Sequence, residues 1–258
     1  MSTPLSNTNA ISTAMPADSK NQTQMERTTE CAKARAIALS PTEAFEPPET
    51  RILLHGISWE TYKRLLGETG EHRTQRFTYR DGMLEIMVPL QQHEEPVRLL
   101  DDFVGVFVDA LGLELLKLGS LTMQHSEQKK GLEPDGCFYI HNEAAVRGVE
   151  TLDFSVHPPP DLVIEVDHSH GSLSKFPIYT ALAIPEIWRL RKGILTIYIL
   201  NADQTGHETS PVSLAFPDFP VQTLPYFLER AKVIGQRSAI RELTAQVQDI
   251  VKNASPEK

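Results

Sequence analysis

The sequence predicts an α/β fold with a mixed β-sheet, and three observations lead to this prediction. Residues 92–111 carry a helical stripe of apolar side chains: Val97, Leu100, Phe103, Val104, Phe107, Val108 and Leu111. Short β-prone runs follow this helix, and the run at 162–166 is apolar enough to be a strand buried on both faces. A second helix and another strand come next. The order helix, three strands, helix, strand is typical of an α/β domain.

The composition is that of a globular protein in a reducing compartment. The 258 residues are 40% hydrophobic and 23% charged, and two cysteines (Cys31 and Cys137) make no disulfide framework. We find no apolar run of about 20 residues and no basic-then-apolar leader, so we expect a cytoplasmic location and no membrane partner. The net charge of −9 argues against a strong nonspecific nucleic-acid binder, but a local basic patch or metal ions would still allow a nuclease.

Three regions are predicted along the chain. Residues 1–46 are rich in Ser, Thr, Asn, Gln and Ala, a composition that predicts a disordered tail. Residues 47–235 are predicted to form the domain, and residues 236–258 a C-terminal helix. The apolar stripe of that helix suits docking on the domain or pairing with a second copy, so a homodimer is one option; the stripe comprises Ile240, Leu243, Val247, Ile250 and Val251.

The first part of the domain carries clear local signals. A helix is predicted over residues 59–66, with Ser58 as its N-cap and Gly67 as its end. Strands over residues 75–80 and 83–88 flank an Asp-Gly pair, the strongest short signal for a hairpin.

The remaining elements are less sharply marked. A polar turn is predicted at 127–131 and a helix at 174–183, because Pro177 is tolerated only in a first turn. Two C-terminal helices are expected. The predicted strands are 113–118, 121–125, 135–140, 162–167, 186–190, 193–200 and a short one near 213–216.

Two acids and one lysine stand out near the ends of these elements. Asp135 follows a proline, and Glu165 emerges from the buried strand, where an ionised carboxylate costs several kcal/mol unless it is paired or binds a metal. Lys175 begins the next helix and returns toward the same strand end. Two acids and a lysine at strand ends form a minimal set for metal-assisted phosphodiester hydrolysis.

Several short sequence motifs, in the same order along the chain, resemble those of the Uma-type family of restriction-endonuclease-like proteins, within the PD-(D/E)xK nuclease superfamily. The resemblance covers roughly residues 58–227. The matching words are Tyr79-Arg80-Asp81-Gly82-Met83-Leu84-Glu85-Ile86-Met87, His93-Glu94, Glu133-Pro134-Asp135, Pro159-Pro160-Asp161-Leu162-Val163-Ile164-Glu165-Val166-Asp167, Lys175-Phe176-Pro177-Ile178-Tyr179 and Pro185-Glu186-Ile187-Trp188.

The resemblance implies a restriction-endonuclease-like core and a nuclease acting on DNA. It implies that Asp135 and Glu165 hold Mg²⁺ (or Mn²⁺), and that Lys175 completes the catalytic set. Asp167 stands where the superfamily pattern has a lysine. Lys175, at the start of the next helix, resembles a lysine that takes over this role from a different position in the chain. The likeness also suggests an outer shell or a second metal position formed by Glu85, His93 and Asp167, with Glu94 a weaker candidate.

Other interpretations of these residues stay open. Asp135 could cap a turn while Glu165 pairs with a cation, and Glu85 could lie on a solvated strand face. The run Asp167-His168-Ser169-His170 could be a transition-metal loop, although two His one residue apart are a weak signal. Basic residues in turns could contact phosphates or simply be solvated: Lys129, Lys130, Arg189, Arg191 and Lys192. A catalytically silent binding or regulatory module is the alternative to an enzyme.

Overall fold

The computed structural model describes residues 50–70, 73–89, 91–167 and 173–254. These residues belong to one compact unit, Pro48–Lys258. The predicted tail at 1–46 and the two histidines of the predicted transition-metal loop lie outside the described residues. No helix within the described ranges is both long enough and apolar enough to cross a membrane.

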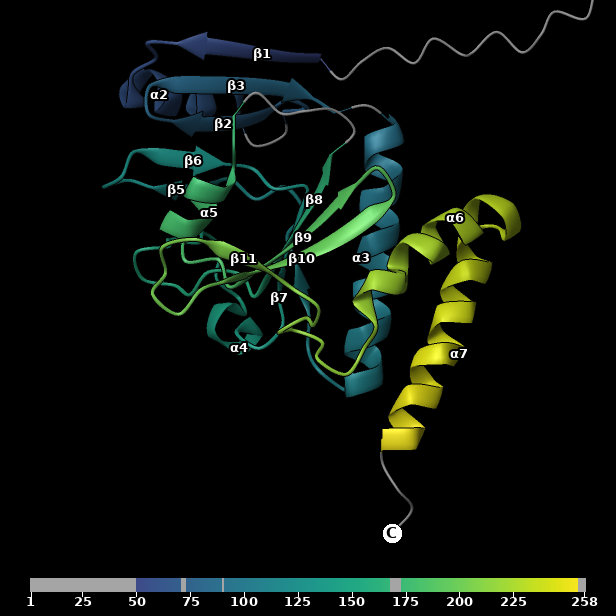
Figure 1. The fold of residues 1–258 in the computed structure, drawn as a ribbon. Coiled ribbons are helices and arrows are strands. Elements are labelled where there is room, and N and C mark those ends of the chain that lie inside the picture. Colours follow the sequence, from purple (N-terminus) through teal and green to yellow (C-terminus); the bar gives the residue numbers. More distant parts are fainter. Residues whose placement is uncertain (1–49, 71–72, 90, 168–172, 255–258) are drawn as a thin grey trace, which may run out of the picture. The chain divides into compact units, whose positions relative to one another are not determined.

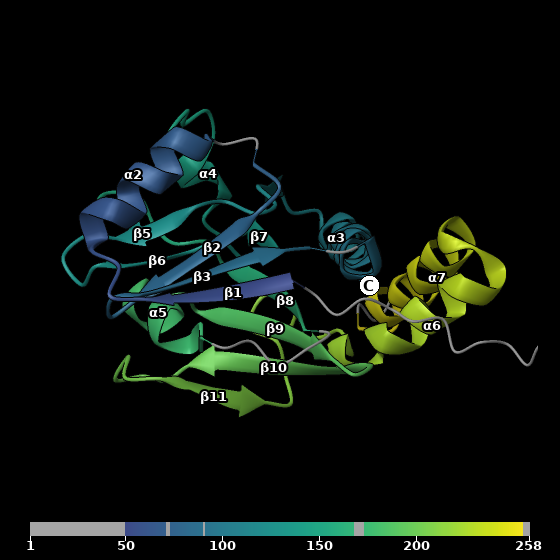
Figure 2. The same ribbon diagram turned by 90° about the horizontal axis from the view of Figure 1, so that it is seen from above.

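The first of two sheets is antiparallel and contains the predicted hairpin. Its strand order is β1 (Thr50–His55), β3 (Met83–Val88), β2 (Arg76–Arg80), β6 (Lys130–Leu132) and β5 (Met123–His125). Helix α2 (Trp59–Thr69) lies beside this sheet (Figure 2). It packs on the sheet through aromatic rings, since Tyr62 stacks on Tyr79 with centroids 4.8 Å apart.

The second sheet is mixed, as predicted, and carries the acidic strand. Its order is β11 (His207–Ser210), β10 (Ile194–Leu200), β9 (Glu186–Arg191), β8 (Leu162–Asp167), β7 (Gly136–Tyr139) and β4 (Leu116–Lys117). Strands β8 and β9 run parallel, and the remaining neighbours run antiparallel. Every residue from Leu162 to Val166 is buried, so the buried strand is confirmed.

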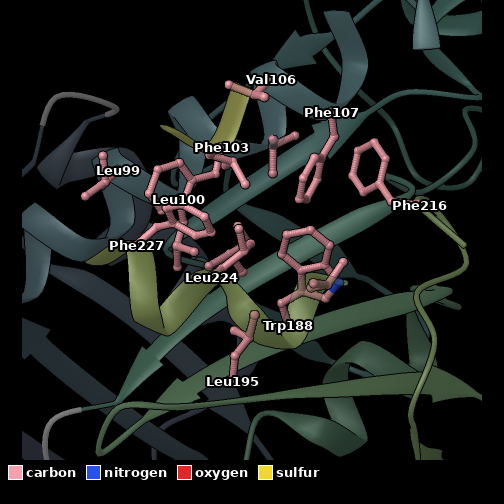
Figure 3. Packing of buried hydrophobic residues seen from close by; sticks show 14 of the residues in the cluster. Leu99, Leu100, Phe103, Val106, Phe107, Trp188, Leu195, Phe216, Leu224 and Phe227 are labelled. Atoms are coloured by element: carbon pink, nitrogen blue, oxygen red, sulfur yellow. The ribbon is translucent and has the colours of Figure 1, made fainter. Parts of the chain in front are cut away.

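The main core lies between this sheet and the long helix α3 (Gln91–Leu111). The predicted stripe is confirmed from Val97 to Val108, whereas its last member, Leu111, is exposed. Figure 3 shows Phe103 and Phe107 of α3 among Trp188 from β9 and Phe216. Helices α6 (Leu224–Ile234) and α7 (Gln236–Ala254) extend the core, and Figures 1 and 2 both show α7 beside α3. The α7 stripe therefore docks on its own domain, with Leu243 and Val247 buried. A homodimer stays a prediction.

Several predicted boundaries in the first sheet are wrong. Helix α2 continues through Gly67 and ends at Gly70, whose φ of 70° suits a residue without a side chain. The turn expected at 127–131 is partly strand β6. Strand β1 was not predicted, because the consecutive apolar residues Ile52, Leu53 and Leu54 hide the alternation in the sequence. In the structure, Ile52 and Leu54 lie on the exposed face and Leu53 is half-buried.

Differences also occur around the second sheet. Residues 213–216 are not a strand, because the Ala215 N–H is bound at 2.8 Å by the Glu186 carboxylate rather than by a neighbouring strand. The strand in this part is β11, at His207–Ser210. The predicted helix at 174–183 is shorter, since α5 spans Phe176–Ala181 and Lys175 is its N-cap. Short helices α4 (Glu143–Val146) and η1 (Val221–Thr223) lie in segments expected to be loops.

Candidate active site

The two predicted acids lie on neighbouring strands of the second sheet. Asp135 immediately precedes β7, and Glu165 lies in β8, which pairs antiparallel with β7. The backbone N–H of Val166 donates to Asp135 Oδ2 at 2.8 Å, and this bond ties Asp135 to the strand that carries Glu165. Asp135 is 1% exposed and Glu165 5% exposed, so both carboxylates are withdrawn from water.

Lys175 reaches Glu165 from the start of α5. Its Nζ donates to Glu165 Oε1 at 2.9 Å and to Oε2 at 2.7 Å, and it lies 3.4 Å from the Glu133 carbonyl oxygen. Tyr179, one helical turn later, donates its hydroxyl to Glu165 Oε1. The predicted helix start therefore does bring the lysine to the acidic strand. Tyr179 belongs to one of the matching sequence motifs, but the sequence alone indicates no role for it, because its contact with Glu165 depends on how α5 packs.

Asp135 faces two basic side chains from other elements. His93 Nε2, from the first turns of α3, lies 3.1 Å from Asp135 Oδ2, and Arg76 Nη1, from β2, lies 3.4 Å from Oδ1. The same Arg76 nitrogen donates to the Pro134 carbonyl at 2.8 Å, which fixes the guanidinium beside the acid. His93 thus lies where the outer-shell hypothesis expects it. Arg76 was missed, because no local pattern marks it.

The pKa values of the two carboxyl groups are shifted in opposite directions. Burial and the neighbouring Asp135 raise the pKa of Glu165 to about 7, although Lys175 and Tyr179 oppose this rise. Burial also acts to raise the pKa of Asp135, but the His93 hydrogen bond and the charges of Lys175 and Arg76 outweigh it and hold that pKa below its ordinary value. At neutral pH, Asp135 is therefore the ionised partner, while Glu165 lies close to its titration point.

The acidic pair also determines the state of its two donors on α5. Burial alone would lower the pKa of Lys175, but Glu165 and Asp135 raise it above its ordinary value, so the ammonium stays charged. Burial and Glu165 raise the pKa of Tyr179 well above 10, so its hydroxyl keeps the proton that it donates.

A cavity of about 280 Å³ opens beside Glu165 and Lys175, and Glu85 and Asp167 line it too. Glu85 is 2% exposed; it accepts from Arg51 at 2.8 Å and from the Leu173 N–H at 3.2 Å. The solvated-face interpretation of Glu85 is therefore wrong. Asp167 Oδ2 accepts from Arg189 Nε at 2.6 Å. Glu85 and Asp167 therefore line the same cavity as Glu165, and their outer-shell role stays a prediction.

The predicted basic residues separate into two places. Arg189 lines the cavity, and Lys130 lies beside α5, with Nζ 3.5 Å from the Pro177 carbonyl oxygen. Lys192 and Lys129 lie in turns with positive φ, at the β9–β10 and β5–β6 connections. Arg191 ends β9 opposite Asp167 in the register with β8. Arg189 thus lies at the cavity and Lys130 beside α5.

The donor set agrees with a hard divalent cation. Within the described ranges, no group of three or more His, Cys, Asp and Glu side chains gathers as a complete metal cage. Mg²⁺ does not need one, because it commonly uses one or two carboxylates and keeps several waters. Asp135 Oδ1 is buried and accepts no hydrogen bond from the described part of the chain. Its ion-pair partner Arg76 Nη1 lies 3.4 Å away, so this oxygen keeps lone pairs for an ion. Asp135 and Glu165 therefore fit Mg²⁺ or Mn²⁺ chemically.

Comparison with protein-family models agrees with this geometry. The model named Uma2, described as "Putative restriction endonuclease", matches residues 59–228, well over half of the chain. The chain belongs to the Uma2 family. The matched region of this Uma2-family protein contains Asp135, Glu165 and Lys175, so the resemblance seen in the sequence and the restriction-endonuclease-like fold are confirmed. The family description indicates a nuclease-like function. A comparison with curated proteins gives no match.

Proposed function

We propose that this protein is a metal-dependent endonuclease that hydrolyses phosphodiester bonds of DNA. The observation that carries the proposal is the group formed by the buried acids Asp135 and Glu165 and by Lys175. Lys175 Nζ lies within 3 Å of both Glu165 oxygens, and Glu165 and Lys175 line a cavity. Structural carboxylates are rarely buried side by side, because their mutual repulsion adds to the cost of desolvation. Binding of a divalent cation would explain the pair, because the cation needs negatively charged ligands at this position.

Asp135 and Glu165 would hold Mg²⁺ or Mn²⁺. A bound divalent ion lowers the pKa of water and neutralises charge on the scissile phosphate. Lys175 supplies a cation that can turn from Glu165 toward a phosphate oxygen in the cavity, where a buried charge stabilises the developing negative charge strongly. Glu165 must be ionised to hold the ion, and because its pKa is about 7, protons compete with the metal for this carboxylate below neutral pH. Tyr179 and His93 orient the two acids.

One observation favours a silent binding module instead. Glu165 is fully engaged by Lys175 and Tyr179, and Asp135 is flanked by His93 and Arg76. The acids are therefore neutralised by the chain's own residues, which a protein without catalytic activity would also need.

Nicking of supercoiled plasmid separates the two functions. We expect the wild type to nick DNA with Mg²⁺ or Mn²⁺ and to lose activity in EDTA, and Asp135→Asn to be inactive at every metal concentration. Asp249→Asn, which alters an exposed carboxylate on α7, is the matched control and should nick like the wild type. DNA binding by the wild type without any metal-dependent nicking would establish the silent module and contradict the endonuclease.

A further inference from the structure

A second hollow lies beside the candidate active site, on the other side of α5. This groove of about 670 Å³ is formed by α5, β10 and the residues leading into β11. Its aromatic lining is half-buried Phe176, Tyr198 and His207. Phe176 also lines the cavity that holds Glu165 and Lys175. Phe176 therefore borders both spaces, and the groove adjoins the proposed site of cleavage.

The three rings form a supported aromatic surface. Phe176 meets Tyr198 edge-on with centroids 4.8 Å apart, and its centroid lies 5.9 Å from the His207 ring. His207 is fixed in turn, because its Nε2 lies 2.8 Å from the Ile184 carbonyl oxygen, to which it donates. Burial lowers the pKa of His207, which favours the neutral ring. Aromatic side chains held in one orientation lose little entropy when a flat ligand stacks on them.

Cationic and amide groups surround this surface. The Arg189 guanidinium carbon lies 5.9 Å from the Phe176 centroid, and Lys130 lines the groove from the start of β6. The exposed side chains of Gln128 and Gln204 also line it. Aromatic faces flanked by cations are the combination that binds single-stranded nucleic acid, since bases stack while phosphates are neutralised. Amides can pair with exposed base edges.

We propose that this groove binds an unpaired nucleobase of the DNA strand whose phosphodiester reaches Glu165 and Lys175. Phe176 lies between the two spaces, so a base on one side of it and a phosphate on the other would belong to adjoining parts of one strand. A base inside a duplex is stacked on both faces and cannot use such a surface without being extruded. The inference rests on the proposed nuclease function and specifies its substrate class as single-stranded or locally unpaired DNA.

The test is DNA binding without divalent metal, so that no cleavage occurs. Fluorescence anisotropy would measure the Kd of the full chain for a labelled oligo(dT) strand, for a duplex of the same length, and for a strand of equal length with abasic sugars. Tyr198→Leu and Phe176→Leu keep apolar volume and remove one aromatic face each. Tyr226→Leu, at an exposed aromatic residue on α6, is the matched control.

We expect the oligo(dT) strand to bind more tightly than the duplex and the abasic strand. Each groove variant should weaken oligo(dT) binding by roughly 5- to 100-fold, the effect of losing one base–aromatic contact, and should leave the abasic strand unaffected. Tyr226→Leu should bind like the wild type. Equal binding of oligo(dT) and abasic strands, unchanged affinity in both groove variants, or no binding of DNA at all would overturn the inference.

The outcomes distinguish this inference from the proposed function. Plasmid nicking with unaltered binding in the groove variants would refute the groove alone. Stacking-dependent binding without nicking would refute the endonuclease and leave a nucleic-acid-binding module that uses the same groove.

Discussion

Replacing Lys175 by Met tests the ion pair at the centre of the site. Met keeps much of the apolar stem and removes the ammonium that lies 2.7 and 2.9 Å from the two Glu165 oxygens. Removing one partner of a buried pair leaves the other charge uncompensated, at a cost of about 3–5 kcal/mol in the free energy of unfolding. Glu165 can avoid this cost by taking up a proton, because its pKa is already about 7 and rises further without Lys175.

The destabilisation should therefore depend on pH in a defined direction. In the unfolded chain the Glu165 pKa returns to about 4.3, so between that value and the raised folded value the native state binds the additional proton and stability falls as pH rises. At pH 6, Lys175→Met should cost about 1 kcal/mol, the contribution of a hydrogen bond. At pH 8.5 it should cost about 3 kcal/mol.

Urea denaturation in EDTA, followed by the fluorescence of buried Trp59 and Trp188, measures both values. Lys232→Met is the matched control, because Lys232 pairs with Glu229 at 2.6 Å on the surface and surface pairs contribute little. The double variant Lys175→Met/Glu165→Gln should recover most of the stability lost at pH 8.5. An equal loss at both pH values, or no recovery in the double variant, would refute the account.

Three other predictions test the metal, the tyrosine and the fold. Saturating Mn²⁺ at about 100 times its Kd should stabilise the wild type by about 2.7 kcal/mol, and Asp135→Asn should abolish the rise in Tm; equal Mn²⁺ binding by both proteins in calorimetry would end the metal-site hypothesis. Tyr179→Phe removes a donor to Glu165, so it should cost about 1 kcal/mol and shift the pH profile of cleavage to higher pH, because the Glu165 pKa rises. Gly131→Ala should destabilise the fold by about 1–3 kcal/mol in urea denaturation, since its Cβ would collide with the Tyr62 ring; unchanged stability would contradict the packing of α2 on β6.

The sequence predicts the elements whose signals are local. The α3 stripe, the Asp81-Gly82 hairpin and the apolar run of β8 each depend on neighbouring residues alone, and each is confirmed. The acids and Lys175 also follow from local context, because a carboxylate in an apolar strand needs a partner. The family resemblance then extends this reasoning to their chemistry.

The groups that surround the acids could not be predicted in the same way. Arg76 belongs to the first sheet, and it reaches Asp135 because its strand β2 pairs with β6, which ends at Leu132, just before Asp135. Strands β5 and β6 were expected in the core or in a turn, yet they belong to the sheet that contains the hairpin. They lie there because β6 pairs with β2, which is far away in the sequence, and β5 pairs with β6. Such contacts join segments far apart in the chain, and no residue pattern within either segment encodes them.

A lysine at the start of a helix opposes the helix dipole, and the structure shows why this cost is small at Lys175. Helix α5 has only six residues, and the buried carboxylates Glu165 and Asp135 raise the Lys175 pKa despite its burial. Asp167, at the superfamily's lysine position, is matched by Arg189. The buried acids are thus balanced by the chain's own cations. A divalent ion that binds Glu165 must then compete with the Lys175 ammonium.

This competition predicts opposite effects of Lys175→Met on binding and on catalysis. At pH 8.5, where the proton competes least for Glu165, Mn²⁺ should bind the variant more tightly than the wild type in calorimetry, because no ammonium has to be displaced. Plasmid nicking should nevertheless fall about 10²-fold or more, the usual effect of losing one electrostatic stabiliser. Tighter binding with slower cleavage would assign Lys175 to the reacting phosphate. If affinity and rate fell together, the lysine would instead be needed to assemble the acidic pair, and the catalytic cation would have to be sought at Lys130 or Arg189.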